Sequence, residues 1–196
     1  HGNPPHGELE NRYGCKSFGG SNPSPSAKLS QGVPCGPEPA THVATMQHTL
    51  RAATAADHDF VRQLLLTTSK DYVEQTWGWT NEIQQLVDQD FERWFNPPAS
   101  GQIVQVDGRE VGYLKVADHE DGVLLDMVLL DPAFQNRGLG TALIEPIVQE
   151  AHANGQAVVL QVLKVNPSKR LYERLGFVVS EELPNHHLMH AYPPKA

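Results

Sequence analysis

The run VLLDMVLLDPAFQNRGLGT at residues 123–141 carries the strongest structural signal in the chain. Its first eight residues are apolar except for Asp126, a composition typical of a strand that is buried on both faces of a sheet. Residues 135–141 then supply two glycines, which let a backbone turn tightly and approach a ligand without a β-carbon in the way. The run therefore predicts a buried strand, a glycine loop, and a helix from Gly138 to about residue 153.

The N-terminus of this predicted helix is a candidate anion site. Its first peptide N–H groups lack partners within the helix, and the helix dipole adds a partial positive charge, so a pyrophosphate would fit there. Arg137 could add charge at the rim. The two glycines alone are equally typical of an ordinary turn between a strand and a helix that binds no ligand. A P-loop is excluded because no lysine follows Gly140. A dinucleotide fingerprint is disfavoured because the third glycine is missing and Ile144 stands near where small residues are needed.

Hydrophobic periodicity predicts the elements on both sides of this run. Thr54 and Asp57 have the spacing of a capping box, and Asp107-Gly108 is a strong hairpin signal. Pro146 predicts a kink or a local opening in the helix that contains it. In chain order, the remaining predicted elements are a strand at 47–53, a helix after Asp57, a helix from Thr80 to Asn96-Pro97-Pro98, strands at 102–106 and 111–116, a strand at 157–163, a short helix at 167–175, and strands around Val178 and Leu188.

Composition divides the 196 residues into two parts. Residues 1–45 are rich in Gly, Pro, Ser and Asn and cannot bury enough apolar surface to fold, so we expect a disordered or artificially added tail before a domain at 46–196, with Met46 as a candidate initiator. Both cysteines, Cys15 and Cys35, lie in the tail, and no segment is long enough to span a bilayer. A cytoplasmic protein without a membrane partner is expected. The net charge of −8 argues against a nonspecific nucleic-acid binder.

Two motifs resemble one known family. Gln-x-x-Gly-x-Gly after an apolar strand that ends Leu-Asp-Pro resembles the acetyl-CoA-binding motif of the GNAT (GCN-related) N-acetyltransferase superfamily, and NPSKRLYERLGF at 166–177 resembles its Asn…Leu-Tyr-x-x-x-Gly-Phe segment. The resemblance covers roughly residues 47–193, and residues 46–52 and 77–79 are further similar to a bacterial small-domain branch. It implies an α/β (mixed α+β) fold: a mixed, mostly antiparallel sheet of six to seven strands with a splayed parallel pair, flanked by about four helices.

The resemblance also implies acetyl-CoA-dependent N-acetyltransfer to a primary amine of a small molecule or peptide, by direct attack. Backbone groups of the buried strand would bind the pantetheine arm of the cofactor, and one strand N–H would stabilise the developing oxyanion. The apolar side chains of Leu129 and Leu139 would pack rather than recognise the cofactor. Asn166 also suits an N-cap in front of Pro167. The implied cofactor-binding residues are Val128, Leu129, Leu130, Gln135, Asn136, Arg137, Gly138, Leu139, Gly140, Thr141, Asn166 and Lys169.

Tyr172 and Asp126 are the candidate catalytic side chains. In the family, a tyrosine at this position protonates the leaving thiolate, and a phenol with a pKa of about 10 can protonate a thiolate whose parent thiol has a pKa near 8.5. The alternative for Tyr172 is a packed ring with its hydroxyl in solvent. Asp126 could act as a base, directly or through water, because an alkyl ammonium cannot attack a thioester. The alternative for Asp126 is a hydrogen-bonded structural residue.

Aromatic and acidic residues at 72–79 predict the acceptor pocket. Tyr72, Glu74, Trp77 and Trp79 are expected between the first two helices, where they would suit a cationic amine, although both tryptophans could equally be core anchors. His186 could face this acceptor site. A metal site is not expected, because His186 and His190 on one strand would lie ~13 Å apart. A non-catalytic acyl-CoA sensor, a protein acetyltransferase and a homodimer remain open alternatives.

Overall fold

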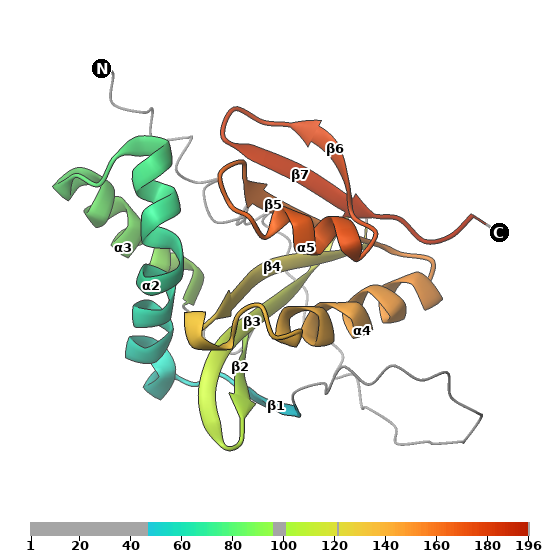
Figure 1. The fold of residues 1–196 in the computed structure, drawn as a ribbon, viewed down its shortest axis with the longest axis horizontal. Coiled ribbons are helices and arrows are strands. Elements are labelled where there is room, and N and C mark those ends of the chain that lie inside the picture. The colour runs from blue at the N-terminus through green and yellow to red at the C-terminus, as the bar shows by residue number, and fades with distance from the viewer. Residues whose placement is uncertain (1–46, 96–100, 121, 196) are drawn as a thin grey trace.

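The computed structural model describes residues 47–95, 101–120 and 122–195. Within these ranges, seven strands form one sheet in the order β1-β2-β3-β4-β5-β7-β6, and four α-helices pack on it (Figure 1). All neighbouring strands are antiparallel except the pair β4 and β5. The predicted fold class is therefore confirmed. The predicted tail 1–45, with Cys15 and Cys35, and the predicted helix stop at 96–98 lie outside the described residues.

The first half of the described chain supplies three strands and two helices. Their bounds are β1 His48–Ala52, α2 His58–Trp77, α3 Asn81–Phe95, β2 Gly101–Val106 and β3 Arg109–His119. Asp107 and Gly108 both have positive φ, 51° and 76°, which is the requirement of the predicted two-residue hairpin turn. Helix α2 is longer than expected: the sequence placed residues 72–79 between the first two helices, whereas α2 continues to Trp77. Within the helix, the hydroxyls of Thr68 and Ser69 donate to carbonyls one turn back, as Ser and Thr side chains inside helices can do.

The second half follows the predicted order closely. Its elements are β4 Gly122–Leu130, α4 Leu139–Ala153, β5 Ala157–Leu163, α5 Lys169–Arg174, β6 Val178–Glu182 and β7 His186–Ala191. Helix α4 runs through Pro146 without interruption, so the opening predicted there does not divide it. None of the helices in the described part of the chain combines the length and the hydropathy needed to cross a membrane.

Strands β4 and β5 pair over a short distance only. Their register joins Gly122 to Ala157, Val123 to Val158, and Leu124 to Val159, and it ends there. Beyond Leu124 the two strands diverge, while β4 stays paired with β3 to Leu130 and β5 stays paired with β7 to Leu163. This is the splayed parallel pair that the sequence resemblance implied.

A β-bulge interrupts β4 just beyond the last β4–β5 pair. Lys115 lies opposite Met127 and Val116 lies opposite Leu125, so Asp126 is the extra residue and has no partner in the β3–β4 register. Bulges redirect side chains and often lie next to functional sites. The bulge therefore marks the point where β4 leaves β5.

Two apolar clusters cover the two faces of the sheet. One lies against α4 and includes Leu139, Ile144 and Phe177; the other lies against α2 and α3 and includes Val61 and Phe91. Figure 1 shows α4 and α5 together in front of the sheet, with α2 and α3 at the left. Strand β4 contributes to both clusters, which agrees with the predicted burial on two faces, although four of its residues that border the splay or the strand end are only half-buried.

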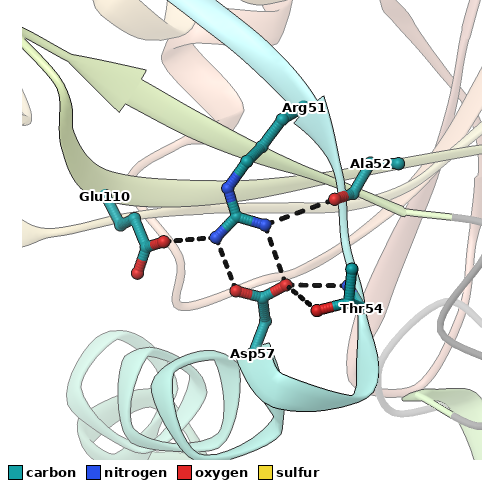
Figure 2. A network of polar contacts seen from close by, with 5 residues as sticks. All are labelled: Arg51, Ala52, Thr54, Asp57 and Glu110. Carbon is teal, nitrogen blue, oxygen red and sulfur yellow. Dashed lines mark hydrogen bonds and ion pairs between the residues drawn. The ribbon is translucent and has the colours of Figure 1, made fainter.

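A polar network fixes the start of α2 (Figure 2). The Arg51 guanidinium of β1 donates to both carboxylate oxygens of Asp57, at 2.9 and 2.6 Å, and to Glu110 of β3. Asp57 also accepts from the N–H of Thr54 at 2.7 Å and from its hydroxyl at 3.0 Å, so the predicted capping pair is confirmed. The hydrogen bonds from Arg51 lower the pKa of Asp57 to about 2, against an ordinary value of 3.8. The network ties α2 to the edge of the sheet.

The Asp57→Asn variant should be less stable than the wild type by about 1 kcal/mol near neutral pH, because it weakens the cap and the ion pair. Since the folded pKa of Asp57 lies below its unfolded value, this contribution is complete above about pH 4 and is lost as pH falls towards 2. Urea unfolding at a series of pH values should therefore show a shallower acid loss in the variant. Asp71→Asn, an exposed site on the same helix, is the control. Parallel curves for wild type and Asp57→Asn would contradict the network's role.

Candidate active site

The splay between β4 and β5 opens into a cavity of about 610 Å³. Residues 125–130 of β4 form one wall and residues 160–163 of β5 form the other. The first turn of α4, the turn before α5, and one face of α2 close the remaining sides. This volume lies in the range of small-molecule and cofactor sites. Because β4 and β5 do not pair here, the backbone groups along their facing edges need other hydrogen-bond partners.

The first turn of α4 borders this cavity with uncapped peptide groups. Gly138 is the N-cap, has φ 83°, and provides no capping side chain. A β-carbon at Gly138 would meet nothing within 4 Å, so the space in front of the helix is open. Gly138, Gly140 and Thr141 all line the cavity. The helix N-terminus predicted as an anion site therefore opens onto the cavity.

Gly140 has a packing role as well. A β-carbon at this position would lie 2.9 Å from Leu171 Cδ2. The glycine thus lets α5 approach the first turn of α4 closely, which brings the two predicted motifs together at one site.

The other predicted loop residues divide into two groups. Gln135 and Asn136 line the cavity, and the Gln135 amide donates to the carbonyl of Leu130 at 2.9 Å, which holds the turn closed. Leu139 is 1% exposed and packs in the core, as expected. Arg137 is exposed and is not among the cavity-lining residues. The positive charge at the cavity therefore does not come from the arginine that the sequence suggested.

Helix α5 and the turn before it place Tyr172 in the cavity wall. The Tyr172 ring contacts Phe177 edge to face, with centroids 5.8 Å apart. Burial raises the pKa of Tyr172 to about 12. The phenol is thus protonated at neutral pH and can donate a proton. Tyr172 as a whole is half-buried, and its accessible part borders the cavity.

Asn166 and Lys169, both predicted to bind the cofactor, make local contacts. Asn166 Oδ1 accepts from the N–H of Ser168 at 2.9 Å within the turn before α5, and Asn166 also lines the cavity. The N-cap of α5 is Ser168, so the predicted cap at Asn166 is two residues too early. Lys169 Nζ pairs with Glu173 Oε1 at 2.8 Å, and Lys169 does not line the cavity. The cations that do line it are Arg170 and Arg174, which the sequence analysis missed.

Asp126 lies in the cavity wall but is held in an ion pair. Lys115 Nζ is 2.8 Å from Asp126 Oδ2, and the two side chains are 10% and 2% exposed. Lys115 also donates to the carbonyl of Trp94 at 3.3 Å. A buried carboxylate needs a charged partner of this kind. The geometry favours the structural role for Asp126 over the role of a base.

The acceptor residues predicted at 72–79 lie mostly within α2 and not between helices, because α2 extends to Trp77. Tyr72 lines the cavity, whereas Glu74 is exposed and does not. Trp77 and Trp79 are half-buried and pack against the core between α2, α3 and the sheet, which supports the core-anchor alternative. Leu65, Thr68 and Ser69 line the cavity one and two turns before Tyr72. Counting back from Tyr72 at helical spacing would have found them.

His186 lies next to Trp77 but does not line the cavity. The two ring centroids are 6.2 Å apart, which joins the end of α2 to the start of β7. Elsewhere on β6 and β7, His187 pairs with Glu182 at 3.0 Å and His190 Nδ1 is 2.7 Å from Ser180 Oγ. Among the described residues, no group of three His, Cys, Asp or Glu side chains could hold a metal ion.

Comparison with known proteins agrees with this arrangement. Residues 98–179 match the family model described as "Acetyltransferase (GNAT) domain". This match identifies residues 98–179 as a GNAT acetyltransferase domain, and these residues include the splay between β4 and β5, the glycine loop and Tyr172. The protein is therefore an acyltransferase, and its acyl donor is the acetyl-CoA of that family. A purely non-catalytic sensor is disfavoured.

The individual relatives are distant. The uncharacterized N-acetyltransferase YafP of Escherichia coli is 26% identical over 121 residues, which is 60% of this chain and 69% of YafP. The spore coat polysaccharide biosynthesis protein SpsD of Bacillus subtilis is 21% identical over 112 residues, and only 38% of SpsD is covered. The structure of the PaiA N-acetyltransferase of Thermoplasma acidophilum, solved in complex with coenzyme A, superposes with a TM-score of 0.62 at 15% identity, over 75% of this chain and 99% of that one. The fold is shared over the superposed part of the chain, and these similarities do not identify the acceptor.

The Asp126→Asn variant should lose stability, by about 3 kcal/mol, because the ammonium of Lys115 would stay buried beside a neutral amide. If the role of Asp126 is structural, the pH dependence of kcat/KM should keep its shape. Thermal unfolding and a pH profile of thiol release measure the two effects. Replacing the pair with Lys115→Met and Asp126→Leu together should restore part of the stability. A rate loss of 10²-fold or more with loss of the acidic limb of the profile would instead identify Asp126 as a base.

Proposed function

We propose that the protein transfers the acetyl group of acetyl-CoA to a primary amine of a small molecule or peptide, by direct attack within one ternary complex. The observation that carries this proposal is the coincidence of three features at one cavity. These are unpaired strand edges, an uncapped helix N-terminus, and a half-buried tyrosine that keeps its proton. A cytoplasmic location belongs to the same proposal.

The residues present fit coenzyme A. The N–H groups of the first turn of α4 would hold the diphosphate, as helix N-termini do. The facing edges of β4 and β5 would hydrogen-bond the amides of the pantetheine arm, in the way that a peptide adds to a sheet edge. Bound acetyl-CoA supplies an acetyl group already activated as a thioester. A peptide N–H of β4 beside the thioester carbonyl would stabilise negative charge on its oxygen during attack.

Tyr172 would supply the proton that the departing sulfur needs. In water a phenol with a pKa of about 10 is a weaker acid than a thiol with a pKa near 8.5, and burial raises the pKa of Tyr172 further, to about 12. Burial raises the pKa of a thiol as well as that of a phenol, because both ionised forms are anions. We propose that the proton transfer takes place inside the cavity, where both pKa values are raised.

The acceptor amine has to lose a proton before it can attack. Among the described residues that line the cavity, Asp126 is the only carboxylate, and it is paired with Lys115; no histidine lines the cavity. We therefore propose that the amine enters neutral or passes its proton to water. The rate should then rise with pH along the titration of the amine itself.

A small acceptor is favoured over a folded protein. His186 is paired in register with Leu163, which lines the cavity, and His186 contacts Trp77. This contact joins α2 to β7 beside the cavity, and we propose that it limits the approach of a folded protein from that side. We therefore place small-molecule amines and short peptides before protein surfaces as acceptors.

Gly138→Asp and Gly138→Asn form a matched pair that tests the diphosphate site. Both residues tolerate positive φ better than other side chains do, and they have nearly the same size, so they differ mainly in charge. The Asp variant should bind coenzyme A roughly 10-fold or more weakly than the Asn variant, because it places an anion at the helix N-terminus. Calorimetric titration measures both affinities. Equal affinities of the two variants for coenzyme A would show that the diphosphate does not bind at this helix N-terminus.

Tyr172→Phe should lower kcat by about 10²-fold and leave the dissociation constant of coenzyme A nearly unchanged, because only the proton donor is removed. Stopped-flow thiol release and calorimetry separate the two quantities. An unchanged kcat across the pH range would show that Tyr172 is not the acid.

A panel of amines tests the function as a whole. The full chain is incubated with acetyl-CoA and each amine, and mass spectrometry identifies the acetylated products. Small primary amines should give products, with rates that follow the amine's ionisation. Acetylation confined to folded proteins, or none with any amine despite tight binding of acetyl-CoA, would overturn the proposed acceptor class.

A further inference from the structure

Two arginines on α5 border the cavity. Arg170 and Arg174 are exposed and both line it. Four residues apart in a helix, they lie on the same side of α5. The neighbouring Leu171 is the residue that approaches Gly140 at the first turn of α4. The arginines therefore border the same opening as the proposed diphosphate site.

These guanidinium groups are not engaged by acidic partners in the described part of the chain. Neither forms a salt bridge or a side-chain hydrogen bond there. The acidic residue between them, Glu173, pairs with Lys169 at 2.8 Å. That hydrogen bond is the main cause of the lowered pKa of Glu173, and the charge of Arg170 contributes less. Lys169 thus neutralises Glu173 and leaves the charge of both arginines available at the cavity.

The surroundings make this local charge significant. The whole chain has a formal charge of −8, so a polyanionic cofactor gains attraction only from local groups. Arginine presents a planar set of donors that matches phosphate oxygens in pairs. A phosphate monoester carries about −1.5 to −2 charges near neutral pH and is a strong ligand for such a pair.

We propose that Arg170 and Arg174 bind the 3′-phosphate of coenzyme A, and that they make the enzyme select acetyl-CoA over donors without this phosphate. The inference rests on the proposed function, in which the peptide N–H groups of α4 take the diphosphate. The 3′-phosphate is then the one remaining phosphate group of the cofactor, and these two arginines are the cations that line the cavity within the described residues.

The test is a calorimetric comparison of coenzyme A with 3′-dephospho-coenzyme A, using the full chain. The wild type should bind coenzyme A roughly 10-fold or more tightly than the dephospho form. The double variant Arg170→Gln with Arg174→Gln should bind both ligands alike, at close to the wild-type affinity for the dephospho form. Arg93→Gln, a substitution at an exposed arginine on α3 away from the cavity, should retain the wild-type preference.

Salt dependence gives a second readout that needs no variant. Raising the salt concentration should weaken wild-type binding of coenzyme A more steeply than binding of the dephospho form, because fewer ion contacts are made to the latter. An equal loss of affinity for both ligands in the double variant would assign the arginines to the diphosphate and overturn the proposal. Equal wild-type affinities would overturn it while leaving acetyl-CoA binding intact, whereas binding of neither ligand would overturn the proposed function as well.

Discussion

The limited pairing of β4 with β5 is the constraint on which the rest of the site depends. Three residue pairs hold the two strands together, and the strands then part while each keeps its outer neighbour. Backbone groups on the facing edges are left without sheet partners, which a buried sheet interior does not normally tolerate. The same parting leaves Val128 and Leu130 half-buried in an otherwise apolar strand. A single local failure of pairing thus creates both the space and the hydrogen-bonding groups of the cavity.

Charged residues stabilise the structure around this opening. The Lys115–Asp126 pair lies at the bulge where β4 turns away from β5, and it explains why one aspartate interrupts the apolar strand. The Arg51–Asp57–Glu110 network fixes the first turn of α2, whose later turns form the opposite side of the cavity. Both interactions are structural, and both act on elements that line the site.

Local patterns in the sequence predicted the elements well, because their causes are local. The Asp107-Gly108 turn, the Thr54–Asp57 cap and the strand, loop and helix of residues 123–153 all follow from neighbouring residues. Contacts between distant residues could not be predicted in this way. The partner of Asp126 lies on another strand in a register shifted by a bulge. Sequence spacing also did not show which cations of α5 face the cavity. Lys169 pairs with Glu173, whereas Arg170 and Arg174 line the cavity.

The contact between Gly140 and Leu171 sets a length scale for the whole site. It fixes the separation between the helix terminus proposed for the diphosphate and the hydroxyl of Tyr172, which follows Leu171 in the chain. Because the pantetheine arm has a limited covalent length, this separation determines how far from the diphosphate the sulfur atom can lie. A bulkier residue at position 140 would therefore keep this separation only if the side chain at position 171 became smaller.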